Sequence, residues 1–517
     1  MPRQRRKNRR PAAKCKKKPQ KPARPRSSSR SYSYSRSRSY SGSEGSSDGH
    51  SDEDDPKDYK RGGYHPVTPY QLYNARYRVL SKLGAGAFST VWLCADEKDP
   101  GTGLVAMKVC KSKKSVAEQA QDEVMLLERM HLNGKSSPFV VQMTDHFWHT
   151  GPNGRHKCMT FEVMGENLLA LVKHYDYQGI PLDMCRRISR HTLRGLEYIH
   201  ACGVIHTDVK LENVLICRHD LAELLKEARI AHLAFQGQKA KLECLSKSQK
   251  KRLKKKNKKA AADAKASDAE DKPEDPSPEV PENGVPGKPV NGKPNEGYGQ
   301  DTEVPEIAQP VPPVRQRERF ESLKLEETFA KLADFGNGIK ADNPVTDDIQ
   351  TRQYRSPEVI IGAAWDQTAD VWSAACMFFE LATGDFLFDP KTGDDWDRDE
   401  DHLALIAELL GDLPSKEFCL SGKYSKDFFN NSGKLKHIKN LKMWPLYGVL
   451  SEKYKLSPED AQEMTDFLMP MLSWQPAMRR SATEALKHPW VQPREGEVDE
   501  PVAKEAPAQT PEAPEEA

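Results

Sequence analysis

Two short polar motifs lie far apart in this chain, although their residue types belong together in one site. The first reads His206-Thr207-Asp208-Val209-Lys210-Leu211-Glu212-Asn213, and the second, Asp334-Phe335-Gly336, begins 121 residues after Asn213. In the first motif an aspartate can accept a proton and a lysine can neutralise developing negative charge. An asparagine and an aspartate, one from each motif, supply oxygen ligands of the kind that Mg²⁺ prefers. The fold must therefore bring the two motifs together across a long insertion.

The composition argues against a single compact domain. The chain has 517 residues, of which 30% are charged and 37 are prolines, and one domain rarely grows to this length. The formal net charge of +3 conceals a basic block over residues 1–30 and an acidic end over residues 495–516. Such blocks predict solvated tails that meet charged partners.

Cysteine usage and hydropathy bear on the compartment. The ten cysteines form no Cys-x-x-Cys pair, which favours buried free thiols in a reducing compartment. No stretch approaches the roughly 18 apolar residues of a membrane span, and the basic N-terminus lacks the apolar segment of a signal peptide. We therefore expect a protein of the cytoplasm and the nucleus that contacts no membrane, and we expect a monomer.

Apolar spacing marks the ordered parts of the chain. Strands are predicted near residues 77–80, 90–93 and 105–109, and helices over residues 115–130, 183–201 and 365–384. Between these parts, a basic run from Lys247 to Lys259 leads into a stretch rich in Pro, Gly, Glu and Asp. Such a stretch cannot bury enough apolar surface to offset backbone ordering, so it is predicted to be disordered.

A glycine-containing turn and a lysine precede the first motif. Gly84 and Gly86 lie between two strands, where the backbone can approach phosphate oxygens closely. Ser89 stands where such a loop usually has a third glycine, so the turn alone reads equally well as an ordinary hairpin. Lys108 ends an apolar strand and needs an anionic partner if it is buried, for which Glu123 on the next helix is the natural choice. A surface lysine and a solvated glutamate are the alternative, and the ordered set of motifs makes a phosphate-transfer site the better interpretation.

Residues after the second motif complete the expected frame. Glu358, in Ser356-Pro357-Glu358, is expected to form a buried ion pair with Arg479. Asp370 is expected to accept hydrogen bonds from backbone N–H groups of the first motif.

Taken in order, these motifs resemble a eukaryotic protein kinase and, more narrowly, the SR-protein kinases, which phosphorylate Arg-Ser repeats of splicing factors. Three departures accompany the resemblance: Phe335 and Pro357 stand where the family usually has Leu, and Leu211 replaces a common Pro. The segments that carry the narrower resemblance are 87–93, His206-Thr207-Asp208, 348–356, 381–385 and 398–402.

The resemblance implies an α+β, bilobal protein kinase fold, with a small β-rich N-lobe and a larger helical C-lobe that a disordered spacer interrupts. The expected segments are a disordered basic Arg-Ser tail (1–70), the N-lobe (71–160), the first part of the C-lobe (161–233), the disordered spacer with its basic run (234–322), the second part of the C-lobe (323–492) and an acidic disordered tail (493–517).

ATP and Mg²⁺ are the cofactors that the resemblance implies. The expected catalytic residues are Asp208, Lys210, Lys108 and Glu123, and the expected metal ligands are Asn213 and Asp334. The expected ATP-binding residues are Leu83, Gly84, Ala85, Gly86, Ala87, Phe88, Ser89, Thr90, Val91, Ala106, Lys108, the gatekeeper Phe161, Glu162 and Met164.

Two further sites are implied for a basic substrate. A docking groove is expected at Asp385, Asp401, Glu408 and Lys453, and a pocket for an already phosphorylated residue at Arg352, Arg355 and Arg398. The alternatives are a solvated acidic loop and structural pairing of the arginines with nearby acids.

The resemblance implies a serine/threonine kinase that transfers the γ-phosphate of ATP to serines in Arg-Ser repeats and so regulates mRNA splicing. Thr207 stands where phosphorylation-activated kinases carry Arg, and a neutral side chain cannot anchor a phosphate. We therefore predict activity without phosphorylation of Thr346 or Thr351. Two alternatives stay open: a dual-specificity kinase of the LAMMER type, and a pseudokinase or scaffold that binds splicing factors through its Arg-Ser tail.

Two low-complexity segments have competing interpretations. Residues 27–39 resemble the presumed substrate and could dock to the site, or they could be a plain tail. The basic run 250–256 could serve nuclear import or bind RNA without specificity. The family's spacer usually retains the enzyme in the cytoplasm, so chaperones or import factors are expected partners of this segment.

Overall fold

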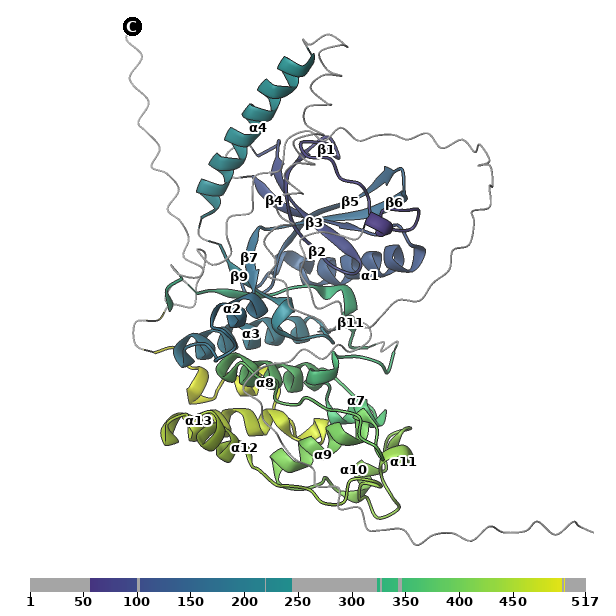
Figure 1. Ribbon diagram of the computed structural model, residues 1–517, viewed down its shortest axis with the longest axis vertical. Coiled ribbons are helices and arrows are strands. Elements are labelled where there is room, and N and C mark those ends of the chain that lie inside the picture. Colours follow the sequence, from purple (N-terminus) through teal and green to yellow (C-terminus); the bar gives the residue numbers. More distant parts are fainter. Residues whose placement is uncertain are drawn as a thin grey trace, which may run out of the picture. The chain divides into compact units, whose positions relative to one another are not determined.

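A computed structural model describes residues 56–99, 103–218, 220–243, 323–325, 328–342, 346–494 and 497. A β-sheet lobe formed by the chain up to Phe161 is followed by a lobe built mainly of helices (Figure 1), which is the bilobal α+β arrangement expected above. The Arg-Ser segment 27–39 and the basic run 250–256 lie outside the described residues. No helix among the described residues is long and apolar enough to cross a membrane.

The N-lobe is a six-stranded antiparallel sheet with one helix, α1, packed against it. The predicted helix 115–130 is α1. Strand β3 lies between β2 and β4 in the sheet, and six of its eight residues are buried. The strand order is β1-β2-β3-β4-β6-β5, with bounds β1 Leu72–Tyr73, β2 Tyr77–Ala85, β3 Ser89–Asp96, β4 Leu104–Cys110, β5 Met143–Gly151 and β6 Gly154–Phe161, and α1 spans Lys114–Met130.

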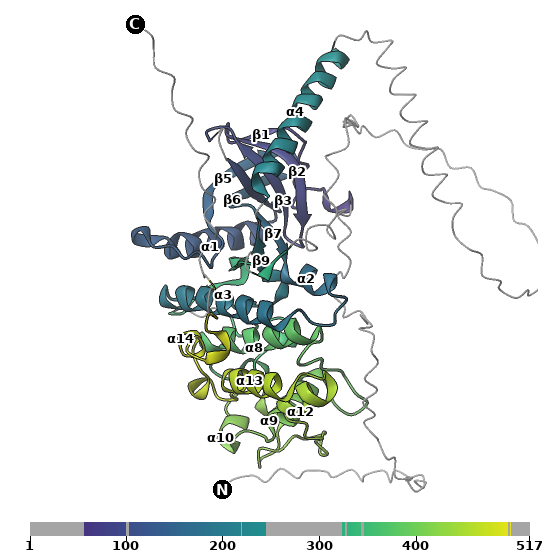
Figure 2. The ribbon, with the colours of Figure 1, turned by 90° about the vertical axis from the view of Figure 1, so that its left-hand side faces the viewer.

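The C-lobe is organised around α8, which spans Thr368–Thr383 and is buried along its whole length. A helix that is apolar on all sides must be surrounded by other elements, and α3, spanning Leu182–Ala201, packs along it (Figure 2). The remaining helices are α2 Leu168–His174, α4 Leu221–Glu243, α7 Pro357–Ile361, α9 Arg398–Leu410, α10 Lys416–Cys419, α11 Ser425–Phe428, α12 Leu446–Gly448, α13 Pro458–Leu468 and α14 Ala482–Ala485.

Short strands that precede and follow the insertion pair with each other. Strand β9, Val214–Cys217, pairs antiparallel with β10, Ala330–Leu332, so that Val214 lies opposite Leu332. Strand β7, Met164–Asn167, pairs with the other edge of β9. Strands β8, Val204–Ile205, and β11, Ile339–Lys340, form a second small pair. These pairings place the two separated motifs side by side.

The first predicted boundary that the structure corrects is the end of the tail at residue 70. Residues 56–70 pack onto the N-lobe, and Tyr64 and His65 are 5% and 3% exposed. This segment buries a few aromatic and imidazole rings rather than a periodic apolar face, so hydrophobic spacing gave no sign of it.

The second correction concerns the start of the spacer at residue 234. Helix α4 continues through Glu243 and therefore crosses that boundary. Its sequence is rich in Ala, Leu, Lys and Glu, which favour helix, and its side chains contact the N-lobe. Tyr70 stacks on His232 and Phe235, at ring centroid distances of 5.0 and 4.3 Å.

A cluster of three imidazoles lies where residues 56–70 contact the sheet. The ring of His65 lies 4.6 Å from that of His149 on β5 and 5.1 Å from that of His156 on β6. Burial, and then the charges of His149 and His156, lower the pKa of His65 to about 4. Burial likewise lowers the pKa values of His149 and His156. Protonation of this cluster therefore opposes folding.

We expect the free energy of unfolding to fall as the pH drops below 6.5. The pKa of His65 is lower in the folded chain than in the unfolded chain, so the unfolded chain takes up the proton first. For His65 alone the loss between pH 7 and pH 5 is about 2 kcal/mol. Urea denaturation of wild type and His65→Phe measures it, because the variant keeps an aromatic ring but cannot titrate. Equal pH slopes in the two proteins would contradict this prediction.

Candidate active site

Lys108 on β4 links helix α1 to the second motif. Its Nζ lies 2.8 Å from Oε1 of Glu123 on α1, which is the ion pair expected from the sequence. The same Nζ lies 3.0 Å from Oδ1 of Asp334. The β-sheet, α1 and the second motif therefore meet at one ammonium group.

Lys108, Glu123 and Asp334 lie close enough for their charges to shift one another's pKa values. Burial alone would lower the pKa of Lys108, but the carboxylates of Asp334 and Glu123 outweigh it and raise that pKa above its ordinary value. In turn, Lys108 holds the pKa of Asp334 well below its usual range, at about 2. Lysine and aspartate are thus both charged at neutral pH, ready to orient phosphate oxygens and a cation.

Asp370 positions the backbone of the first motif. It is fully buried, and its two oxygens accept hydrogen bonds of 2.8 Å from the N–H groups of His206 and Thr207. His200 also lies 2.9 Å from Asp370. The expected contact between Asp370 and the backbone of the first motif is therefore present.

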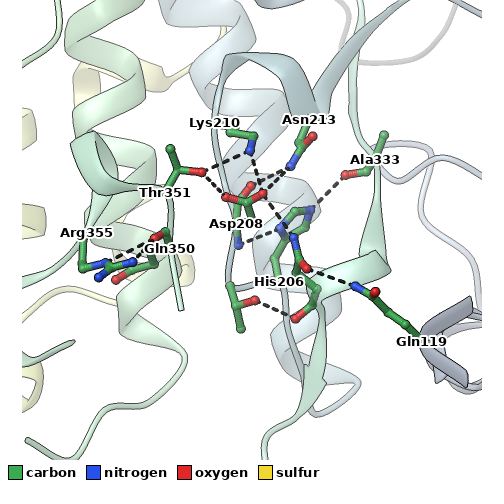
Figure 3. A network of polar contacts seen from close by, with 11 residues as sticks. Gln119, His206, Asp208, Lys210, Asn213, Ala333, Gln350, Thr351 and Arg355 are labelled. Carbon is green, nitrogen blue, oxygen red and sulfur yellow. Dashed lines mark hydrogen bonds and ion pairs between the residues drawn. The ribbon is translucent and has the colours of Figure 1, made fainter. Parts of the chain in front are cut away.

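Asp208 is surrounded by donors from its own loop and from the segment between Asp334 and Glu358, here called the activation segment (Figure 3). Its Oδ2 accepts a hydrogen bond of 2.8 Å from Lys210, and its Oδ1 one of 2.7 Å from the hydroxyl of Thr351. The Asn213 side chain donates to the Asp208 carbonyl at 2.8 Å. Burial alone would raise the pKa of Asp208, but Lys210 and Thr351 lower it below its ordinary value. The carboxylate is therefore ionised and able to accept a proton.

The two motif aspartates line adjoining hollows. Asp334 borders the hollow beneath the glycine-containing turn, Asp208 borders the next one, and Asn337 lines both. Asn337 donates to Asp208 at 3.4 Å, and its carbonyl accepts a hydrogen bond of 2.7 Å from Thr207. From α1, the Gln119 amide donates to the carbonyl of Gly336 at 2.7 Å. These contacts tie the two hollows together through residues 334–337.

Some of the expected ATP-binding residues line the first hollow, and others belong to the strands next to it. Gly86, Ala87, Phe88 and Ser89 line the hollow with Lys108. The remaining loop positions belong to the β2–β3 pair, in which Gly84 lies opposite Val91 and Ala85 opposite Thr90, and Leu83 is 39% exposed.

Strand pairing places the expected gatekeeper and the connection to the C-lobe. Phe161 ends β6 opposite Ala106 on β4. The Glu162 N–H already donates to the Gln142 carbonyl at 3.1 Å, and the Glu162 side chain pairs with Lys331. An adenine contact at this residue is therefore expected to use its carbonyl. Met164 begins β7.

The residues present fit Mg²⁺ and ATP. The Asn213 amide donates its N–H to Asp208, which leaves its carbonyl oxygen as a ligand, and the Asp334 side chain is 51% exposed beside Lys108. The described part of the chain holds no cluster of three or more His, Cys, Asp or Glu side chains suited to a metal. A cation held by one amide and one carboxylate oxygen takes its other ligands from phosphate and water.

The ion pair predicted between Glu358 and Arg479 is present. Arg479 donates to both oxygens of Glu358, at 2.7 and 2.8 Å, and both side chains are fully buried. The guanidinium also lies over the ring of Trp372, at 5.1 Å.

The expected docking residues divide into two kinds. Asp385 accepts hydrogen bonds from Lys453 at 3.1 Å and Tyr454 at 2.8 Å on a partly exposed surface. Asp401 and Glu408 are each only 6% exposed and accept hydrogen bonds from backbone N–H groups of the loops that they support. Alanine at either position would therefore disturb those loops as well as any docking groove.

The expected phosphate pocket contains paired arginines. Arg352 forms an ion pair with Asp399, and Arg355 lies 3.0 Å from Asp348. Burial, and then the neighbouring charge of Arg352, lower the pKa of Arg355. Arg398 is exposed at the start of α9. Arg352 and Arg355 therefore pair with local acids, as the alternative interpretation predicts.

Sequence reasoning missed several residues that shape the site. Gln119 and Asn337 act through backbone carbonyls, which leave no charge pattern in the sequence. Gln350 bonds through its amide to the Ala369 carbonyl and to Ser373, both at 2.9 Å. The sequence indicates Thr351 only as a possible phosphorylation site, whereas its hydroxyl contacts Asp208 and Lys210.

Comparison with known proteins places this geometry in context. A family model of the protein kinase domain matches residues 77–228 and 323–491. SRSF protein kinase 3 of Mus musculus is 37% identical over 516 residues, which cover 86% of this chain and 91% of that protein. The serine/threonine-protein kinase SRPK of Physarum polycephalum is 38% identical over 444 residues, with 85% and 92% covered. Protein kinase dsk1 of Schizosaccharomyces pombe is 37% identical over 480 residues, with 87% and 86% covered.

We expect Thr351→Ala to lower kcat for phosphate transfer by about tenfold, because it removes a hydrogen bond to each of Asp208 and Lys210. Thr351→Ser keeps the hydroxyl and should retain most of the activity. Steady-state kinetics of the two variants make the comparison. Equal losses in both would contradict a role for the hydroxyl.

Proposed function

The chain belongs to the protein kinase family and, within it, to the SR-protein kinases, and from that premise we propose that it transfers the γ-phosphate of ATP to serines in Arg-Ser repeats of splicing factors. The observation that carries the proposal is a set of polar contacts in two neighbouring groups. In one group Lys108 contacts Glu123 and Asp334, and in the other Lys210 contacts Asp208. Residues 334–337 connect the two groups. Regulation of mRNA splicing would follow from such substrates.

Each polar side chain has a task in this reaction. Asp208, ionised because Lys210 and Thr351 hold its pKa low, orients the substrate serine hydroxyl and accepts its proton. Lys210 neutralises charge that develops on the transferred group, and Lys108 orients the ATP phosphates while Glu123 holds it in place. Mg²⁺, held by Asn213 and Asp334, would neutralise phosphate charge when bound.

The alternative of a pseudokinase scaffold is not supported. A protein that binds nucleotide without transferring phosphate needs neither an ionised Asp208 nor the two lysines that flank the reaction path. All of these side chains are present and hydrogen-bonded to one another or to the activation segment. Phosphate transfer is the function that such an arrangement serves.

A basic substrate is favoured by the acidic surface at the start of α9. Asp394 and Asp395 are exposed, and Asp385 lies on a partly exposed surface beside Lys453. An unphosphorylated Arg-Ser repeat is a polycation, which such a surface attracts in a salt-dependent manner.

A phosphorylated serine of the same repeat would replace the local acids as a partner of the arginines. The ion pairs from Arg352 to Asp399 and from Arg355 to Asp348 hold two guanidinium groups close together in spite of their repulsion. Bidentate contacts to a phosphate would offset that repulsion more fully than single carboxylates do. Sequential phosphorylation along the repeat would result.

The setting of this reaction forms part of the proposal. We infer that the protein works in both cytoplasm and nucleus, with ATP and Mg²⁺ as cofactors and Arg-Ser splicing factors as partners. The basic run 250–256 would meet chaperones or import factors. A monomer suffices, because every side chain assigned to phosphate transfer comes from one chain.

Activity without phosphorylation of the activation segment is the second part of the proposal. The Thr207 hydroxyl donates to the Asn337 carbonyl at 2.7 Å, and the Gln350 N–H donates to the Thr207 carbonyl at 2.9 Å. The Gln350 side chain accepts hydrogen bonds from the N–H and hydroxyl of Ser356, at 2.9 and 3.0 Å. Neutral hydrogen bonds thus do the positioning that an arginine and a phosphate do elsewhere.

We expect purified protein to phosphorylate an Arg-Ser repeat peptide at least about tenfold more efficiently, in kcat/KM, than a matched Lys-Ser peptide. Arginine forks fit carboxylates in bidentate fashion, and lysines do not. Radiolabel transfer from ATP measures both rates, with Asp208→Asn as the inactive control. Equal efficiency on the two peptides would refute the substrate class, and no transfer by wild type to any peptide would refute the proposed function itself.

We expect Thr346→Ala, made in a host without other kinases, to keep kcat within about twofold of wild type. The Thr346 hydroxyl contacts only the local N–H of Asp348, at 3.1 Å, among the interactions of the described residues, so its loss should cost less than one ordinary hydrogen bond. Thr351 is unsuitable for this test because it touches Asp208. A loss of more than tenfold in Thr346→Ala, or inactivation of wild type by a phosphatase, would overturn the prediction.

A further inference from the structure

Residues 56–70 form a strap that is fastened to the N-lobe by backbone and side-chain hydrogen bonds. The N–H of Gly62 donates to the Asn153 carbonyl at 3.1 Å, and the Asn153 amide donates to the Tyr64 carbonyl at 2.6 Å. The Ser112 N–H donates to the Gly63 carbonyl at 3.1 Å. The strap is thus held between the β5–β6 turn and the end of β4.

From this position one side chain reaches the glycine-containing turn. The hydroxyl of Tyr64 donates to the carbonyl of Gly86 at 2.5 Å. The ammonium of Lys111 lies 4.1 Å from the centre of the Tyr64 ring and 3.0 Å from a carboxylate oxygen of Asp58. Tyr64 is itself only 5% exposed. The ring is therefore buried against Lys111, and its hydroxyl points at the carbonyl of Gly86.

The other side of the turn is fastened to the same place. The backbone N–H of Lys111 donates to the Phe88 carbonyl at 2.8 Å, and the Gly86 N–H donates to the Ser89 carbonyl at 2.8 Å. The Phe88 side chain between these points is 55% exposed. Tyr64 and Lys111 thus hold the two sides of the turn through the carbonyls of Gly86 and Phe88. The inner surface of the turn lines the hollow beside Asp334.

We propose that Tyr64 is a positioning residue for ATP, acting through the glycine-containing turn, and that the strap is part of the nucleotide site although it precedes the matched kinase domain. The inference rests on the proposed binding of ATP beneath this turn. A turn that is held in its binding conformation before the nucleotide arrives loses less freedom on binding. Without the hydroxyl, the turn would sample more conformations in the free protein, and nucleotide binding would have to order it.

A purely structural role for Tyr64 predicts something different. In that case the ring fills space between Lys111 and Tyr59, whose ring lies 5.6 Å away, and loss of the hydroxyl would change stability without a preference for one substrate. The effect of the hydroxyl on ATP, compared with its effect on the peptide, therefore separates the two roles.

The test is Tyr64→Phe in the full chain, because it keeps the ring and removes only the hydroxyl. We expect KM for ATP and Kd for Mg-ADP to rise about three- to tenfold, the range for one lost hydrogen bond. KM for an Arg-Ser peptide and kcat should stay within about twofold. Tyr73→Phe is the matched control, since the Tyr73 hydroxyl bonds to Gln71 at 3.2 Å, away from the turn, and it should leave KM for ATP unchanged.

A second variant acts on the strap without touching Tyr64. Lys111→Met removes the cation over the Tyr64 ring and the ion pair with Asp58, and it keeps the backbone N–H that bonds to Phe88. It should raise KM for ATP in the same direction as Tyr64→Phe. The inference is overturned if active wild type and Tyr64→Phe share the same KM for ATP, or if both substrate KM values rise together with a lowered Tm. Failure of wild type to transfer phosphate would instead refute the proposed function.

Discussion

The pairing of β9 with β10 is the constraint on which the rest of the structure depends. Three residue pairs, from Val214 with Leu332 to Ile216 with Ala330, join chain segments that the long insertion separates. Beyond the strands, the Ala333 N–H donates to the Asn213 carbonyl at 2.9 Å. Closing a loop costs only about 2 kcal/mol more for each tenfold increase in its length. The core can therefore carry an insertion of this length, provided that the strand pair is buried and its register is fixed.

Once the strands are paired, Lys108 organises the charges that remain. Its two acidic partners differ in exposure, because the Glu123 side chain is 4% exposed and that of Asp334 is 51% exposed. A buried carboxylate that lost its lysine would be left without compensation, so Glu123 is the permanent partner. The open side of Asp334 can turn to a cation while Lys108 remains held. One ion pair thus maintains the lysine, and the other can be exchanged as ligands bind.

Much of this arrangement could be predicted from the sequence, because a charged side chain that is buried needs a partner of opposite charge. The partner of Lys108 follows from a lysine that is costly to bury alone. The ion pair of Glu358 with Arg479 and the role of Asp370 follow from the resemblance of their motifs to those of protein kinases, and both contacts are present. The helices predicted at 115–130 and 183–201 agree with α1 and α3 within one residue at their starts.

Contacts from side chains to backbone carbonyls could not be predicted in the same way. Any residue can offer a carbonyl, so nothing in the sequence marks Gly336 as the partner of Gln119 or Gly86 as the partner of Tyr64. An acidic stretch also carries no sign of which carboxylates turn inward. Asp401 and Glu408 are predicted as docking residues for a basic peptide, and one oxygen of each also accepts a hydrogen bond from the protein's own backbone.

The backbone around Asp208 carries strain that the neighbouring hydrogen bonds offset. Thr207, Asp334 and Gln350 have φ values of 65°, 61° and 69°, in the left-handed region that is unfavourable for residues with a side chain. At about 1–2 kcal/mol each, these conformations persist only where the surroundings determine them fully. Asp370 accepts the Thr207 N–H, Lys108 holds the Asp334 carboxylate, and the Gln350 amide is fixed by α8. Each strained residue is therefore fixed by a buried or charged neighbour within the chain.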